Sequence, residues 1–132
     1  SAPILNEGNM LAFCVFERKK TLSDFLDEGK EKMMQQQLQS TLNTNEERLD
    51  LLHTTTLPWH SFTAFKHPKR LDKQDSIPKI AWGKYIRNAS SIQMPIAIEV
   101  NHALMDGIHV AQFITSLQEK LYRMDTAHNL IS

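Results

Sequence analysis

The sequence predicts an α/β fold of two layers, in which helices cover a mixed β-sheet. Apolar residues alternate with others from Ile92 to Val100, which is the period of a half-buried strand. Two longer segments, 22–39 and 108–123, instead repeat their apolar residues at helical spacing. A sheet needs a covering layer, and two amphipathic helices are available to supply it.

The first third of the chain predicts one strand and one long helix. A short apolar run within residues 9–17 is typical of a buried strand. Thr21 followed by Asp24 resembles a capping box, with Asp in place of the usual Glu, and predicts a helix from Leu22 to Gln39. Residues 46–52 are consistent with a short second helix.

The middle of the chain changes to strand patterns. We expect strands at 57–65, 79–86 and 92–100, with a polar loop at 66–76. Pro95 cannot donate to a ladder, so the last strand is expected to be irregular there. Because these strands follow one another without intervening helices, a mixed sheet is favoured over a doubly wound parallel one.

Length and composition limit the class of protein. The 132 residues fit one domain, and 41% of them are apolar. Lys plus Arg and Asp plus Glu both count 15, so charge gives no reason to expect nucleic acid or a membrane as a partner. Cys14 has no internal disulfide partner, and its apolar neighbours indicate an inert core thiol. We expect a cytoplasmic protein.

A polar cluster follows the alternating strand. His102 continues the apolar face of Ile98 and Val100 by parity, and the chain turns at Asp106-Gly107 into the last helix. A partly desolvated imidazole at this position suits proton transfer. Asp106 could hold the loop or the ring, and Gly107 permits backbone conformations that other residues resist.

Two other interpretations of His102 stay open on spacing alone. A single His beside an apolar face is often a hydrogen-bonded core or loop residue. A metal site made of His102, Asp106 and His109 has helical spacing, but the break at Gly107 argues against one continuous face, so no metal is expected.

The segment 101–107, Asn-His-Ala-Leu-Met-Asp-Gly, resembles the His-x-x-x-Asp-Gly signature of coenzyme-A-dependent acyltransferases. Residues 57–65 are similar to the Pro-Trp-x-x-Phe-x-x-Phe segment of chloramphenicol acetyltransferases, and residues 78–85 to their Gly-Lys-Tyr strand. Residues 94–110 match them almost position by position. The order and spacing of these segments resemble that family over residues 13–121.

This resemblance implies that residues 1–132 form the C-terminal portion of one chloramphenicol-acetyltransferase-like domain, with the N-terminal part of the domain not included. It implies an O-acetyltransferase that transfers directly from acetyl-CoA to chloramphenicol or a similar hydroxyl-bearing small molecule. His102 would be the general base, supported by Asp106, and Lys84 and Tyr85 would lie near the coenzyme. The family forms homotrimers with active sites between subunits.

Three departures from the family bear on activity. Ala64 occupies the position of a serine that stabilises the oxyanion, and Ala81 that of a threonine that acts through water. Thr63 is expected to point to the opposite face of its strand. The family's arginine partner of the motif aspartate lies in the part not included here, which leaves Arg87 and Arg123 as candidates to pair with Asp106.

Three functions follow as expectations. The first is the acetyltransferase itself, and the second is the same enzyme class with a different acceptor. The third is a catalytically weak or inactive oligomeric remnant that binds coenzyme A or a ligand, which the two alanines favour.

Overall fold

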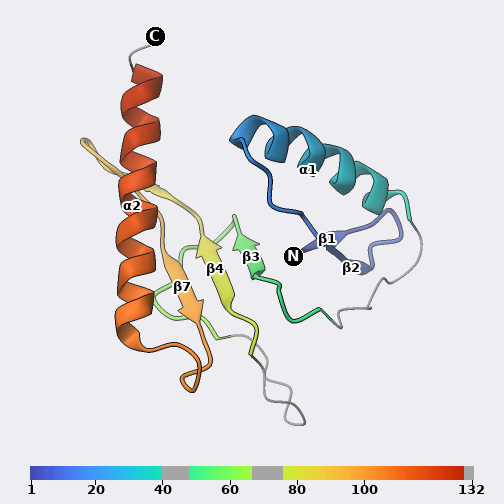
Figure 1. Cartoon of the computed structure of the whole chain (residues 1–132). Helices are drawn as coiled ribbons and strands as arrows, with labels where there is room; N and C mark the ends of the chain where they lie inside the picture. Colours follow the sequence, from blue (N-terminus) through green and yellow to red (C-terminus); the bar gives the residue numbers. More distant parts are fainter. Residues whose placement is uncertain (40–47, 67–75, 130–132) are drawn as a thin grey trace. The chain divides into compact units, whose positions relative to one another are not determined.

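The computed structural model describes residues 1–39, 48–66 and 76–129, with side chains up to residue 124. The chain divides into two compact units, residues 1–99 and 100–132, each with its own internal structure (Figure 1). That the whole chain forms one domain remains a prediction.

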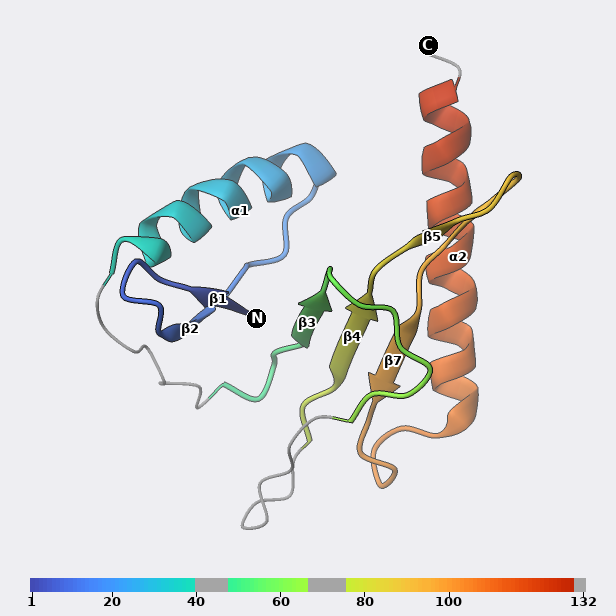
Figure 2. The same cartoon turned by 180° about the vertical axis from the view of Figure 1, so that it is seen from behind.

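A three-stranded mixed sheet lies at the centre of the first unit. It contains β3 (His53–Leu57), β4 (Lys79–Gly83) and β7 (Ile96–Glu99) in the order β3-β4-β7. Strand β3 runs parallel to β4, and β7 runs antiparallel to it (Figure 2). Ile80 and Ala81 of the central strand are buried, so the mixed sheet predicted from the sequence is confirmed.

A second, two-stranded antiparallel pair begins the chain. It joins β1 (Ala2–Leu5), which the sequence did not predict, to β2 (Leu11–Cys14), which lies inside the expected strand. Asn9 turns the chain between them with a φ of 57°, a conformation that Asn tolerates better than most residues. Cys14 is a free, buried cysteine, and its burial raises the pKa of its thiol.

The helix α1 (Leu22–Gln37) packs beside this pair of strands. Its start confirms the capping prediction, because Thr21 Oγ1 accepts a hydrogen bond from the Asp24 N–H at 3.1 Å. The ring of Phe16, just after β2, lies 6.2 Å from that of Phe25 on the helix. At the other end, the Glu7 N–H donates to the Gln37 carbonyl at 3.0 Å, which satisfies a helix-end acceptor, and the buried Asn6 side chain donates to the Gln39 carbonyl just beyond the helix at 3.0 Å.

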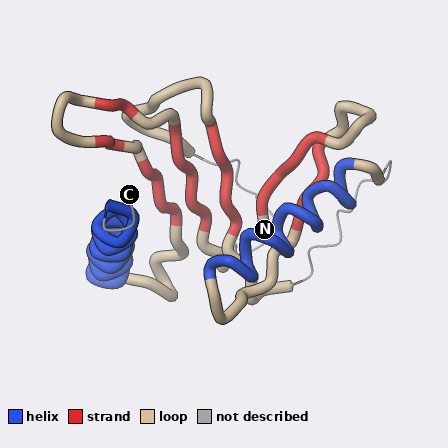
Figure 3. The backbone as a smooth tube through the Cα atoms, turned by 90° about the horizontal axis from the view of Figure 1, so that it is seen from above, coloured by secondary structure: helices blue, strands red, loops and turns tan. Residues whose placement is uncertain are grey.

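The predicted strand 92–100 is divided in two at Met94-Pro95. Its first part, β6 (Ile92–Gln93), pairs antiparallel with β5 (Ile86–Arg87) in a short hairpin, and its second part is β7. Figure 3 shows the hairpin continuing from the strands of the main sheet. The irregularity expected at Pro95 is therefore confirmed, since its carbonyl accepts from the Gly83 N–H while its own nitrogen has no hydrogen to donate.

Two element predictions are wrong. Residues 58–65 form a loop, and the strand lies earlier, at His53–Leu57. The β-branched Thr54, Thr55 and Thr56 suit a strand, whereas Pro58 removes a ladder donor. Residues 48–52 are not helical, while 46–47 and most of the expected loop 66–76 lie outside the described residues.

The second unit consists of a turn followed by the helix α2 (Gly107–Asn129), which confirms and lengthens the helix expected at 108–123. Within the described ranges, no helix is both long enough and apolar enough to span a membrane.

Candidate active site

The turn that carries His102 is built by bonds between near neighbours. Asn101 Oδ1 accepts a hydrogen bond from the Ala103 N–H at 2.9 Å. The Asn101 carbonyl accepts from the N–H groups of Leu104 and Met105, both at 3.0 Å. These bonds fold residues 101–105 back on themselves, and His102 lies in the bend.

The side chain of His102 is exposed, so the partly desolvated ring expected from the sequence is not found in the described part of the chain. Strand β7 ends at Glu99, so the strand alternation that was to carry His102 onto an apolar face stops before reaching it. Two large apolar neighbours are exposed as well, with Leu104 at 63% and Ile108 at 60%. The turn and the first residues of α2 therefore carry exposed apolar side chains as well as the exposed imidazole.

Asp106 lies directly before α2 and organises the helix start. Its Oδ1 accepts from the Gly107 N–H at 2.6 Å, and its carbonyl accepts from the N–H groups of His109 and Val110. Arg123 is not its partner, because 17 helical residues separate the two by about 25 Å along the axis. Arg87 belongs to the other unit.

Gly107 does not need the conformational freedom predicted for it. The chain has no glycine with positive φ among the described residues, and a Cβ built on Gly107 meets nothing within 4 Å. The position therefore accommodates a side chain in the described part of the molecule.

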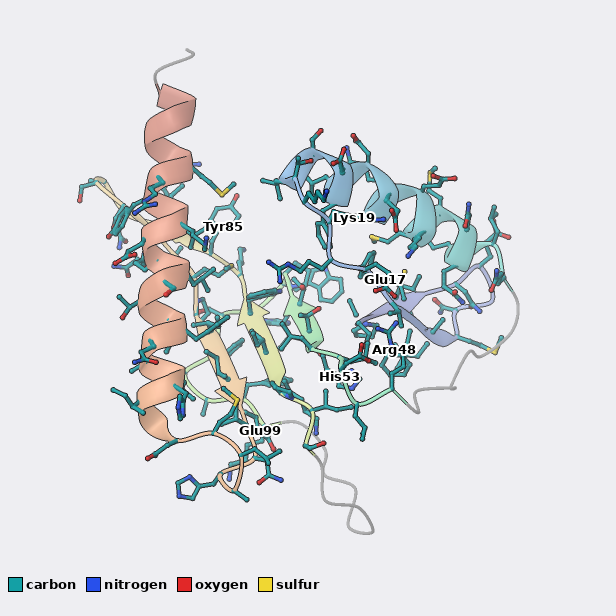
Figure 4. All side chains as sticks on the ribbon, in the orientation of Figure 1. Glu17, Lys19, Arg48, His53, Tyr85 and Glu99 are labelled. Atoms are coloured by element: carbon teal, nitrogen blue, oxygen red, sulfur yellow. The ribbon has the colours of Figure 1, made fainter. Side chains whose placement is uncertain are left out.

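Lys84 and Tyr85 extend from the end of β4 in the first unit. The Lys84 N–H donates to the His60 carbonyl at 2.9 Å, and the Gly83 N–H donates to the Pro95 carbonyl at 3.1 Å. Both side chains are exposed, and that of Tyr85, labelled in Figure 4, is 58% exposed. A rigidly attached cation and aromatic ring are thus available side by side along the chain.

Gly83 is required where it stands. A Cβ at this position would lie 2.9 Å from the His60 carbonyl oxygen and 2.9 Å from Pro95 Cγ, which is closer than carbon atoms approach without displacement. The loop at 58–65 therefore packs directly against the Gly-Lys-Tyr segment, and the absence of a side chain permits it.

The two alanines that replace family hydroxyls lie in different surroundings. Ala81 is 0% exposed in the middle of the sheet, between Thr55 of β3 and Ala97 of β7. Ala64 is exposed in the loop, so the position has room for a larger side chain. The strand-parity argument that excluded Thr63 is wrong, because Thr63 lies in a loop.

The site residues fall into two local groups. His102 and Asp106 share the turn of the second unit, and Lys84 and Tyr85 share one segment of the first. The catalytic and coenzyme-binding roles assigned to them remain predictions. Within the described ranges, no three His, Cys, Asp or Glu side chains gather closely enough to hold a metal ion.

The structure gives two residues a role in holding the turn that the sequence analysis did not assign to them. Asn101 supplies the side-chain acceptor at the front of the turn. His109 Nδ1 accepts from the Asp106 N–H at 3.0 Å at its back. The signal was present in the sequence, since His109 lies three residues after Asp106, the spacing of a capping box.

Comparison with solved structures identifies the architecture. A chloramphenicol acetyltransferase structure superposes with a TM-score of 0.67 at 18% identity, covering 89% of this chain and 58% of that one. At this identity the match establishes the fold, the α/β class with a mixed sheet that these acyltransferases share.

Sequence comparison then places the chain in a family. The chloramphenicol acetyltransferase family model matches residues 6–118, which include every candidate site residue, so the chain belongs to that family. A chloramphenicol acetyltransferase of Clostridium perfringens is 27% identical over 106 residues, 80% of this chain and 50% of that protein. Chloramphenicol acetyltransferase 3 of Escherichia coli is 35% identical over 68 residues, 52% of this chain and 32% of that protein.

The chain spans about half the length of the curated relatives that it matches over the longest stretch.

Proposed function

We propose that the protein is an acetyl-CoA-dependent O-acetyltransferase that acts on chloramphenicol or a similar small molecule with a free hydroxyl. The observation that carries the proposal is the family match over residues 6–118, together with the turn at 101–106 that presents His102 directly before α2.

In the proposed reaction, His102 removes the proton from the acceptor hydroxyl while its oxygen attacks the thioester carbonyl. The tetrahedral intermediate expels coenzyme A as a thiolate, and the histidine returns the proton to that sulfur. The acceptor gains an acetyl ester, coenzyme A leaves as a free thiol, and His102 ends unchanged. No acyl-enzyme is formed.

Lys84 and Tyr85 fit a coenzyme A site in their chemistry. A Lys ammonium attracts phosphate groups, and an exposed aromatic face can stack on adenine. Neither side chain has a hydrogen bond or ion pair within the part of the chain that the structure describes. Gly83 gives the segment a fixed position, because its backbone is in close contact with His60 and Pro95.

The exposure of His102 requires a further surface to cover it, because proton transfer in these reactions benefits from an environment without bulk water. The exposed Leu104 and Ile108 around the turn supply apolar area for such a contact. A neighbouring subunit of a homotrimer provides it in this proposal, and sedimentation equilibrium of the protein tests the assembly.

The experiment that tests the function measures the release of free thiol from acetyl-CoA in the presence of chloramphenicol. Wild-type protein is expected to turn over, and His102→Ala is expected to lower kcat by about 10²–10⁴-fold, the usual contribution of a general base. Thiol release that is equal in His102→Ala and wild type would rule out His102 as the base.

A second candidate function is favoured by the absence of hydroxyls at Ala64 and Ala81. In that case the protein binds coenzyme A but does not transfer the acetyl group. Calorimetric titration with coenzyme A distinguishes the two, since binding without any thiol release over a range of hydroxyl acceptors identifies the non-catalytic module.

A further inference from the structure

The helix start behind His102 is completed by an imidazole ring. The Asp106 N–H donates to His109 Nδ1 at 3.0 Å, and the His109 N–H donates to the Asp106 carbonyl at 3.0 Å. The two residues are therefore joined by a reciprocal pair of bonds. This pair lies entirely within the second unit.

This arrangement is the second half of a capping box. A helix begins with N–H groups that have no partner inside the helix, and the side chain three residues along can reach back to satisfy the first. Glu or Gln normally does so, because each carries an oxygen acceptor. At His109 the acceptor is a ring nitrogen, which accepts only while it is unprotonated, so the ring must be neutral with its hydrogen on Nε2.

The bond has a direct consequence for the turn. Only four residues lie between Asn101 and Asp106, and the Asn101 side chain and carbonyl already hold the front of that segment. His109 holds the amide at its back. The loop that presents His102 is therefore hydrogen-bonded at both ends, and breaking either set of bonds is expected to make the loop more mobile.

We propose that His109 is a positioning residue, which fixes the turn carrying His102 by capping Asp106 with the Nδ1 atom of a neutral imidazole. The expected effect of His109 on catalysis rests on the proposed function. Its expected effect on the turn rests on the hydrogen bond. His109 itself does not touch the reacting atoms in this proposal.

The test uses the full-length protein as wild type, His109→Gln, His109→Ala and a control, Gln112→Ala. Gln supplies the usual oxygen acceptor of a capping box, Ala supplies none, and Gln112 is an exposed position one turn further along the helix. The measurements are the ¹⁵N resonances of the His109 ring, amide hydrogen exchange at residues 103–106, and kcat and KM for thiol release.

The expected ring signature is a hydrogen on Nε2 and an accepting Nδ1. His109→Ala is expected to speed exchange at residues 103–106 and to lower kcat by about fivefold, the effect of losing a typical cap, with little change in KM. His109→Gln is expected to restore both values to within about twofold of wild type. Gln112→Ala is expected to match wild type.

A ring with its hydrogen on Nδ1 would overturn the proposal. So would unchanged exchange in His109→Ala, or a Gln variant no better than the Ala variant. The ring signature and the exchange results can be as expected while wild-type protein releases no thiol. That outcome would contradict the proposed acetyltransferase function but would still support the proposal that His109 fixes the turn.

Discussion

The turn that carries His102 and the segment that carries Lys84 and Tyr85 are held by different kinds of contact. The turn has bonds between residues at most four positions apart, from Asn101–Ala103 at its front to Asp106–His109 at its back. The Gly83–Tyr85 segment instead depends on His60 and Pro95, which reach it from distant parts of the chain. The geometry of the first is encoded locally, whereas the second exists only when the sheet has formed.

The two helix starts are both held by bonds between residues three positions apart, but they use different side chains. The α1 start uses the Thr21 side chain, which accepts from Asp24, and the α2 start uses the later side chain, His109, which accepts from Asp106. Each helix therefore contains one half of a capping box. The half at α1 is made by a hydroxyl oxygen of the residue before the helix, while the half at α2 is made by a ring nitrogen of a residue in its first turn.

Among the variants that test this comparison, the largest effect is expected from placing a hydroxyl at residue 64, in the loop that packs against Gly83. Ala64→Ser places a hydrogen-bond donor at an exposed loop position, where the resemblance implies oxyanion stabilisation, and kcat is expected to rise by about a hundredfold. The thiol-release assay measures it, with the exposed Ala89→Ser as control. A change of less than about twofold would show that the loop does not bring residue 64 to the reaction.

A matched pair of glycines tests the comparison directly. Gly83→Ala forces a Cβ against the His60 carbonyl and Pro95, and is expected to cost about 1–3 kcal/mol of unfolding free energy and to raise the KM for acetyl-CoA. Gly107→Ala meets nothing within 4 Å and is expected to gain about 0.4–1 kcal/mol.

Denaturant unfolding and acetyl-CoA kinetics on both glycine variants check these values. Equal stabilities for the two variants would contradict the distinction between a segment held by close packing and a turn held by its own bonds.

The smallest effect is expected at an exposed ionic contact of the first unit. Arg48 bonds Glu17 at 2.7 Å and also Asp50 at 2.7 Å, and these hydrogen bonds lower the pKa of both carboxyls (Figure 4). A carboxyl whose pKa is lowered by folding stabilises the protein above its unfolded pKa, and that stabilisation disappears as pH falls through the folded pKa.

Arg48→Gln is therefore expected to be slightly less stable than wild type near neutral pH, with the difference vanishing as pH falls below about 4. The gap is expected to shrink in high salt, because exposed pairs are screened. Thermal unfolding at several pH values measures it, with the exposed Lys30→Gln as control. A gap that is independent of pH would exclude the ionic mechanism.

Sequence reasoning succeeded where the deciding interactions lie close together along the chain. The start of α1 at Thr21, the presence of a strand at β7 and the helix after Gly107 all follow from residues that lie close together in the chain. It failed at residues 57–65, because Trp59, Phe62 and Phe65 have strand propensity while Pro58 and the packing against Gly83 impose a loop.

The sequence by itself determined the start of α1 at Thr21, the strand before His102 and the helix after Gly107, since each depends on residues that are near neighbours in the chain. Only the tertiary structure decided that β3 begins at His53, that Gly83 has no space for a side chain, and that His102 is exposed in this chain. The physical reason is that close approach and burial depend on which distant segments come together, and a local pattern does not specify those segments.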